Sequence, residues 1–129
     1  MTYVYLSAED VVDIAGFAVE GRRAVVRDAG LVAAAAHRPS ATPLGQEAYP
    51  DVFDKAAALL QSLAVDRPFG GGNKRTAWTS CVVFLALNDV QLRPDIDAAE
   101  RLVIAVASGS VEEVKVISEA LRDLAESSV

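Results

Sequence analysis

The sequence predicts an all-α fold, a compact bundle of about six helices in one domain that spans residues 1–129. Apolar residues recur at helical spacing through most of the chain. Glycines and prolines lie almost wholly at the junctions between these periodic segments, and beyond the first few residues no segment alternates like a half-buried strand. Because 52 % of the 129 residues are hydrophobic, the chain can bury a core of its own.

Two helices are expected in the N-terminal part of the chain. The run Ser7-Ala8-Glu9-Asp10 has the form of a capping box at the start of the first helix. An apolar stripe follows it, formed by Val11, Val12, Ile14, Ala15 and Phe17. Asp28 can cap a second, short helix from residue 30 to about residue 36.

The third and fourth helices are very apolar, so they are expected at the centre of the bundle. The third begins at Pro50-Asp51, because the first turn of a helix tolerates proline. The fourth runs from about residue 73 to residue 87. It contains Cys81, which is expected to be an inert packing residue.

Two further helices complete the bundle. The fifth follows Pro94 and stops at Ser108-Gly109. The sixth begins with a second capping-box pattern, Ser110-Val111-Glu112-Glu113. Its apolar residues then repeat at intervals of three and four, at Val114, Ile117, Leu121 and Leu124.

Composition excludes several classes of function. The net charge is −6 and the isoelectric point about 4.7, which argues against a nucleic-acid binder. One cysteine cannot form an internal disulfide, and one histidine cannot build a histidine-rich metal site. The N-terminus lacks a basic-then-apolar signal, and no apolar run approaches ~18 residues. We therefore expect a soluble cytoplasmic protein that binds neither nucleic acid nor membranes.

Two segments interrupt the helical pattern. Residues 38–49, R-P-S-A-T-P-L-G-Q-E-A-Y, contain two prolines and one glycine and predict an ordered loop. This loop is either a plain connection or a functional loop, since ~12 residues is long for a bundle. The second interruption is R-P-F-G-G-G-N-K-R at residues 67–75.

The three glycines of the second segment predict an anion-binding loop. Gly70, Gly71 and Gly72 let the backbone turn sharply and open directly into a helix, whose free N–H groups and positive dipole end then converge on one spot. Asn73 adds an amide donor, while Lys74 and Arg75 add positive charge. The alternative is a flexible corner with two solvated basic residues. The pattern of neither a nucleoside-triphosphatase phosphate loop nor a dinucleotide-binding loop is present.

Residues 67–75, followed by Thr76-Ala77, resemble the signature of the Fic/Doc family, H-x-F-x-[D/E]-[A/G]-N-[G/K]-R. The chain from about residue 26 to residue 88 is similar to the Doc branch in particular. The similar segments are G-L-V-A-A-A-A-H-R-P before the loop, Y-P-D-V-F-D-K-A-A-A-L-L leading to it, and N-K-R-T-A and F-L-A-L-N-D-V after it. This resemblance covers about half of the chain.

The resemblance implies an all-helical fold with the motif loop between two central helices. Fic/Doc proteins transfer part of a nucleotide to a protein hydroxyl. Doc-type members, with lysine at the position of Lys74, transfer the terminal phosphate of ATP to elongation factor Tu, which stops translation. They are toxins that a small antitoxin silences. By this resemblance Phe69 anchors the loop in the core. Trp78 follows Arg75 by three residues on one helix face, and it either packs in the core or lines a nucleotide base pocket. The phosphate-binding positions are Gly70, Gly71, Gly72, Asn73, Lys74 and Arg75, and residues 38–49 form a flap that orients the target peptide.

Two departures from the family pattern put catalysis in doubt. Arg67 occupies the position of the histidine that deprotonates the attacking hydroxyl, and an arginine side chain stays protonated at neutral pH. Gly71 occupies the position of the acidic residue that helps to hold Mg²⁺, so binding of this metal is open. The chain is either a weakened ATP-dependent phosphotransferase or a non-catalytic Fic-fold module that binds a nucleotide or a partner.

Two other side chains and one absent motif complete the expectations. His37 and Asp66 are possible substitutes for the missing base, although a helix-end role is expected for His37 and pairing or capping for Asp66. The inhibitory motif [S/T]-x-x-x-E-[G/N] of many Fic proteins fails here, because Ser108 and Glu112 are followed by Glu113. Inhibition by a separate antitoxin is therefore expected.

Overall fold

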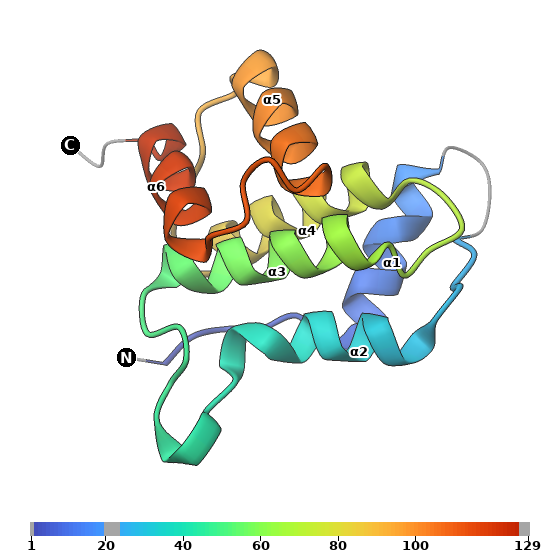
Figure 1. Ribbon diagram of the computed structural model, residues 1–129, viewed down its shortest axis with the longest axis horizontal. Helices are drawn as coiled ribbons and strands as arrows, with labels where there is room; N and C mark the ends of the chain where they lie inside the picture. Colours follow the sequence, from blue (N-terminus) through green and yellow to red (C-terminus); the bar gives the residue numbers. More distant parts are fainter. Residues whose placement is uncertain (1, 20–23, 127–129) are drawn as a thin grey trace.

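The computed structural model describes residues 2–19 and 24–126, and these residues form six α-helices (Figure 1). The predicted all-α bundle is therefore confirmed. The helices are α1 (Ala8–Ala18), α2 (Ala29–His37), α3 (Val52–Asp66), α4 (Asn73–Leu87), α5 (Ile96–Ala107) and α6 (Val114–Leu124), with two 3₁₀ turns, η1 (Arg38–Ser40) and η2 (Pro43–Gly45), between α2 and α3. None of the helices found is long and apolar enough to cross a membrane; the search covered the described part of the chain.

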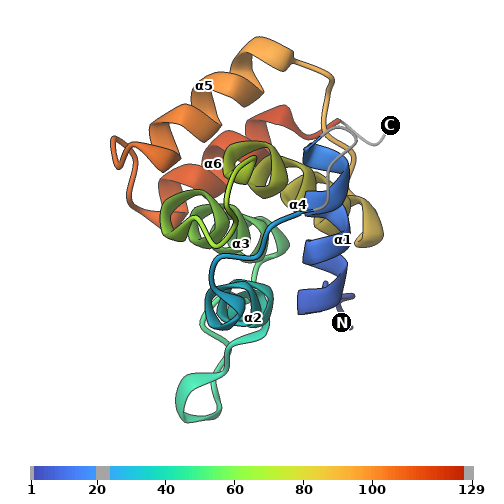
Figure 2. The same ribbon diagram turned by 90° about the vertical axis from the view of Figure 1, so that its right-hand side faces the viewer.

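Helices α3 and α4 form the centre of the bundle, as their sequences predict. In Figure 2 they lie between α2 on one side and the α5–α6 pair on the other, with α1 beside α4. Helix α3 is buried round most of its surface, with Leu60 and the three alanines 56–58 fully inaccessible. These small side chains allow α4 to pack closely, and Ala77 and Cys81 of α4 are also fully buried.

Short polar caps explain where four helices begin. Ser7 accepts a hydrogen bond from Asp10 N and donates its own N–H to the Asp10 carboxylate, so the predicted capping box is present. Asp28 caps α2 as predicted, through Leu31 N at 3.1 Å. Asp51 and Asp95 cap α3 and α5. The predicted start of α3 needs a small correction, because Pro50 lies outside the helix and Asp51 is its cap.

The capping box predicted for the sixth helix is absent. Helix α6 begins at Val114 with Glu113 as its N-cap, and no side chain caps it. Ser110 instead contacts the hydroxyl of Ser108 at 3.0 Å, and Val111 N donates to Ala105 O at 3.1 Å. The residues of the predicted box are therefore held against the end of α5, where Gly109 turns the chain with φ +82°, and the helix starts one turn later.

The stripe predicted for α1 is too wide by one residue. Val11, Ala15 and Ala18 are buried, whereas the Phe17 side chain is 85 % exposed. At 100° per residue, Phe17 points well away from the arc that the three buried residues share.

The loop over residues 38–49 is ordered, as predicted, and its base is fastened to α3. The Arg38 guanidinium donates to the Tyr49 hydroxyl and to three acceptors on α3, Ala58 O, Gln61 Oε1 and Ser62 Oγ. Lys55 is fully buried and donates to Pro39 O and the Glu47 carboxylate, at 3.1 and 2.9 Å. Burial alone would lower the pKa of Lys55, but its hydrogen bond to Glu47 and the neighbouring Tyr5 raise it above its usual value.

Candidate functional site

Six residues connect α3 to α4, and both ends of this glycine loop (residues 67–72) have left-handed backbone. Arg67, the residue after α3, has φ 50° and ψ 61°, and Gly72, the N-cap of α4, has φ 70° and ψ 18°. Glycine adopts such angles freely, whereas an arginine does so at a cost of about 1–2 kcal/mol. The conformation of Arg67 therefore depends on contacts with the rest of the fold.

A segment about forty residues earlier supplies those contacts. Val26 and Phe69 form an isolated antiparallel bridge, and Gly70 N donates to Val25 O at 2.8 Å. The N–H groups of Arg27 and Asp28 both donate to Pro68 O. We call residues 25–28 the splint. The sequence analysis missed this pairing, because so short an extended segment carries no periodic signal.

Phe69 and Asn73 fix the centre of the loop. Phe69 is only 2 % exposed and belongs to the hydrophobic core, which is the anchoring position expected for it. The Asn73 side chain accepts from Phe69 N at 3.0 Å and donates to Phe69 O at 2.9 Å. These two bonds close the loop. The Asn73 amide has two N–H hydrogens and only one of them is used here, so the other remains for a ligand.

The three glycines differ in what the structure requires of them. A Cβ on Gly72 would lie 3.0 Å from Val19 Cγ1, and the positive φ adds strain. A Cβ on Gly70 would lie 3.3 Å from the Val25 side chain. Gly71 has neither constraint among the residues that the structure describes, since a Cβ there meets none of their atoms within 4 Å. A side chain at position 71 is therefore sterically allowed.

The start of α4 presents unpaired donors and positive charge. The first helical bond runs from Thr76 N to Gly72 O, and we find no acceptor for the N–H groups of residues 73–75 in the described part of the chain. No side chain caps this end either. Lys74 and Arg75 are exposed on this first turn, and Arg75 donates to Ala18 O at 3.2 Å. Such a helix end attracts anions, phosphates in particular.

Two more arginines, Arg67 and Arg27, lie at the C-terminal end of α3, next to the start of α4. Arg67 itself is exposed. Arg27 donates from Nη2 to Asp66 O at 2.8 Å and from Nε to Arg67 O at 3.0 Å. Arg27 therefore satisfies carbonyl groups that have no partner within the helix, at the negative end of its dipole. Sequence reasoning did not single out Arg27.

Of the two predicted substitutes for the missing base, only Asp66 lies next to the loop. His37 ends α2, and α2 starts beside Pro68 and leads away from the loop, so His37 is exposed at the far end. Asp66 is exposed at the end of α3, next to Arg67. Trp78 is half-buried and packs against the core. Cys81 is completely buried, and burial raises the pKa of its thiol to about 12.

The expected position of the flap needs correction. Figures 1 and 2 show the tip of the loop over residues 38–49 pointing away from the body, at the opposite end of α3 from the glycine loop. Helix α3 has 15 residues and is therefore roughly 22 Å long. The loop lies far from the glycine loop because of the path of α2. This helix begins beside the glycine loop and ends, just before residue 38, near the N-terminal end of α3.

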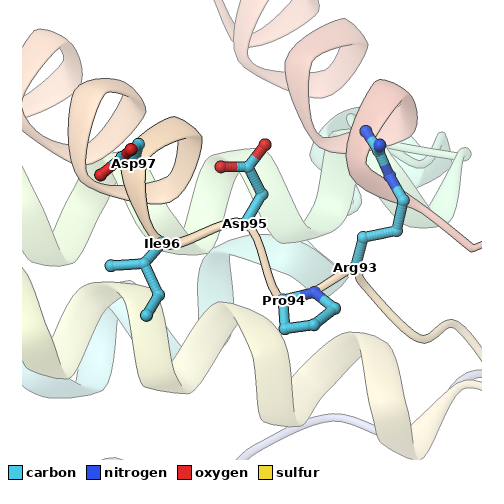
Figure 3. A pocket seen from close by; sticks show the side chains of 5 residues that line it. All are labelled: Arg93, Pro94, Asp95, Ile96 and Asp97. Carbon is cyan, nitrogen blue, oxygen red and sulfur yellow. The ribbon is translucent and has the colours of Figure 1, made fainter.

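Two hollows of the surface lie away from the glycine loop. One of about 560 Å³ is lined by residues 93–97, between α4 and α5 (Figure 3). There Asp95 caps α5 and Arg93 donates to Asp123 O, so these side chains already have structural partners. A smaller cleft of about 310 Å³ lies along α3 and reaches Asp66. Neither hollow is lined by residues of the glycine loop.

Comparison with known proteins identifies the family. A model of the Fic/DOC family matches residues 5–85, which include α3, the glycine loop and nearly all of α4. The chain belongs to the Fic/DOC family. Among Fic/DOC proteins, Toxin Doc from Mycolicibacterium smegmatis (strain ATCC 700084 / mc(2)155) is 51 % identical over 106 residues, which cover 81 % of each chain.

The magnesium ion that Fic/DOC chemistry implies does not fit the residues present. Position 71 offers no oxygen, because it is glycine. The carboxylate of Asp28, beside the loop, already accepts from Leu31 N. Within residues 2–19 and 24–126, no three histidines, cysteines or carboxylates gather where they could hold a metal ion. The chain keeps Gly72, Asn73, Lys74 and Arg75 of the Fic/DOC loop and has no carboxylate at position 71.

Proposed function

We propose that this protein is a Doc-type toxin of a toxin–antitoxin module, active in the cytoplasm, whose glycine loop binds the phosphates of ATP. The observation that carries the proposal is the start of α4. There the N–H groups of residues 73–75, which have no acceptor among the described residues, lie on the same turn as Lys74 and Arg75. The 51 % identity to Toxin Doc of M. smegmatis supports the same conclusion.

The residues of the loop can position the nucleotide, but they lack a group that accepts the proton of the attacking hydroxyl. The backbone from Gly70 to Gly72 brings the chain close to the phosphates, and Asn73, Lys74 and Arg75 hold them. Phe69 keeps the loop fixed from the core. These groups position the nucleotide and neutralise its charge, which are the main contributions in phosphoryl transfer. Arg67 cannot take the proton of the attacking hydroxyl, so we expect transfer to be slower by about 10²–10⁴ than with histidine there.

The proposed target is a hydroxyl of elongation factor Tu, and the experiment is transfer of labelled phosphate from ATP to that protein. Arg67→His and the double variant Arg67→His, Gly71→Asp should transfer more phosphate than the chain with Arg67 and Gly71, and should arrest bacterial growth. Position 71 has room for the Cβ of the new side chain, because no atom of residues 2–19 or 24–126 lies within 4 Å of it. If the double variant neither transfers phosphate nor slows growth, the phosphotransferase proposal is wrong.

A second candidate function is a non-catalytic module that binds a nucleotide or a partner. The absence of both a base at position 67 and an acid at position 71 favours it. Both candidate functions include binding of a ligand at the glycine loop, and calorimetry with ATP tests whether ATP binds. Arg75→Ala should weaken ATP binding, whereas Arg101→Ala, an exposed arginine on α5, should leave it unchanged. Binding without transfer, even after restoration of the histidine, would favour the non-catalytic module.

The proposed partner is a small antitoxin encoded beside this protein. We expect it to present a carboxylate to Arg75, whose guanidinium in this structure donates to Ala18 O. Co-expression with the neighbouring reading frame, followed by purification on one tagged chain, should recover both proteins. If nothing small co-purifies, the antitoxin proposal fails. If a complex forms and Arg75→Glu does not weaken it, the proposed contact with Arg75 is wrong.

A further inference from the structure

Arg27 is the link between the splint and the end of α3. Its guanidinium donates to the carbonyls of two consecutive residues, Asp66 at 2.8 Å and Arg67 at 3.0 Å. Its own N–H donates to the carbonyl of the next residue, Pro68, at 2.8 Å. One residue therefore fixes three successive carbonyl groups, and position 67 lies in the middle of them.

Position 67 needs such a constraint. Arg67 is one of only three non-glycine residues with positive φ among those described, the others being Leu44 and Asp89. Such a conformation persists only where the surroundings enforce it. The carbonyls at the end of α3 also need donors, because none is available within the helix. The rigid fork of the Arg27 guanidinium meets both requirements at once, whereas a lysine ammonium on its flexible stem has no fixed donor geometry.

We infer that Arg27 is a positioning residue, which sets the backbone of residue 67 and so the direction in which its side chain leaves the loop. This inference rests on the proposed function, since residue 67 occupies the position of the proton-accepting histidine of the family. Arg27 acts through residue 67, because its bonds are to the carbonyls of residues 66–68 and the phosphate-binding N–H groups belong to α4.

The test uses the full chain and a matched control. Arg27→Ala and Arg27→Lys remove the fork, while Arg93→Ala removes a comparable bond, from an exposed arginine to Asp123 O near the end of α6. The first readout is NMR: backbone carbon shifts and couplings at residue 67, and hydrogen exchange of Gly70 N–H, which is bonded to Val25 O. This readout does not depend on any activity.

In Arg27→Ala, residue 67 should leave the left-handed region. Exchange of Gly70 N–H should speed up by about tenfold or more, because the loop loses hydrogen bonds from a charged donor, and each such bond is worth about that factor in an opening equilibrium. Arg27→Lys should show a smaller change of the same kind, and it covers the case in which Arg27→Ala does not fold. Arg93→Ala should leave residue 67 and Gly70 unchanged. A left-handed residue 67 with unchanged Gly70 exchange in both Arg27 variants would overturn the inference.

The second readout separates positioning from general damage. In the Arg67→His background, Arg27→Lys should lower the kcat of phosphate transfer by about tenfold or more while the Kd for ATP stays within about twofold, because the α4 donors are untouched. Equal losses in kcat and ATP affinity would contradict a positioning role. If Arg67→His transfers no phosphate at all, the proposed function fails, and the NMR result alone decides whether Arg27 positions residue 67.

Discussion

Gly71 and Gly72 are neighbours in the glycine loop, yet only Gly72 needs to be glycine. Gly72→Ala should destabilise the fold by about 1–2 kcal/mol, because alanine disfavours the left-handed backbone and its Cβ would press on Val19. Gly71→Ala is the matched control and should be neutral or stabilising by up to ~1 kcal/mol, since the unfolded chain loses freedom. Urea unfolding of both variants checks this. Equal destabilisation by the two substitutions would contradict the loop conformation described above.

Cys81 is a residue whose chemistry is suppressed by burial. The pKa of its thiol is raised to about 12, so at pH 8 the thiol of the folded protein stays neutral and inaccessible. We expect its reaction with an aromatic disulfide reagent to be slower in the folded protein than in guanidinium chloride by at least about a thousandfold, because only unfolded molecules react. Rapid modification of the folded protein would mean that this part of α4 opens easily.

At the scale of elements, the two capping-box patterns make a controlled comparison. Ser7→Ala should cost about 1 kcal/mol, because Ser7 caps α1. Ser110→Ala should stay within about 0.5 kcal/mol, because Ser110 caps no helix. Thermal unfolding of both variants measures the difference. A larger loss for Ser110→Ala would mean that α6 starts earlier than Val114.

The same capping box predicts a dependence on pH. The hydrogen bond from the Ser7 backbone N–H, followed by that from its hydroxyl, lowers the pKa of Asp10 below 3.8. Its contribution to stability is therefore present above pH 3.8 and is lost as the pH falls through the lower pKa of the folded state. Asp10→Asn should be less stable than the natural chain near neutral pH, and the difference should shrink below pH 3.8 in unfolding curves. A difference that grows on acidification would contradict this assignment.

At the scale of the whole molecule, an acidic protein presents a cationic site. The net charge is −6, yet Arg27, Arg67, Lys74 and Arg75 gather at the glycine loop and the ends of the helices that flank it. With glycine at position 71, the charge of a nucleotide must be met by Lys74, Arg75 and the backbone N–H groups at the start of α4. ATP affinity in EDTA should therefore lie within about threefold of that in excess Mg²⁺. Calorimetry in both buffers tests this expectation.

A loss of ATP affinity of tenfold or more in EDTA would contradict the expectation that ATP binds without Mg²⁺. It would imply a metal ligand other than residue 71. The double variant Arg67→His, Gly71→Asp is the comparison, because it removes one cation and adds a carboxylate where the loop has room. That variant should bind ATP more tightly with Mg²⁺ than without it.

Much of the fold was predictable because it depends on contacts between near neighbours in the chain. Helical spacing located the six helices, and Ser7, Asp28 and the three glycines marked ends that depend on residues two to four positions away. The same local logic failed at Ser110, because a hydrogen bond from Val111 to Ala105 competed with the cap. The prediction that Phe17 is buried failed because the apolar residues of α1 do not show how much of the helix surface its neighbours cover.

By itself, the sequence determined the helices, the glycine loop between the two central ones and the loss of a base and an acid at positions 67 and 71. Only the tertiary structure decided what holds that loop. The splint and Arg27 reach it from about forty residues away, and the path of α2 places residues 38–49 at the opposite end of α3. The physical reason is that all these contacts end on backbone carbonyl groups, which every residue carries, so no residue pattern marks them before the chain is folded.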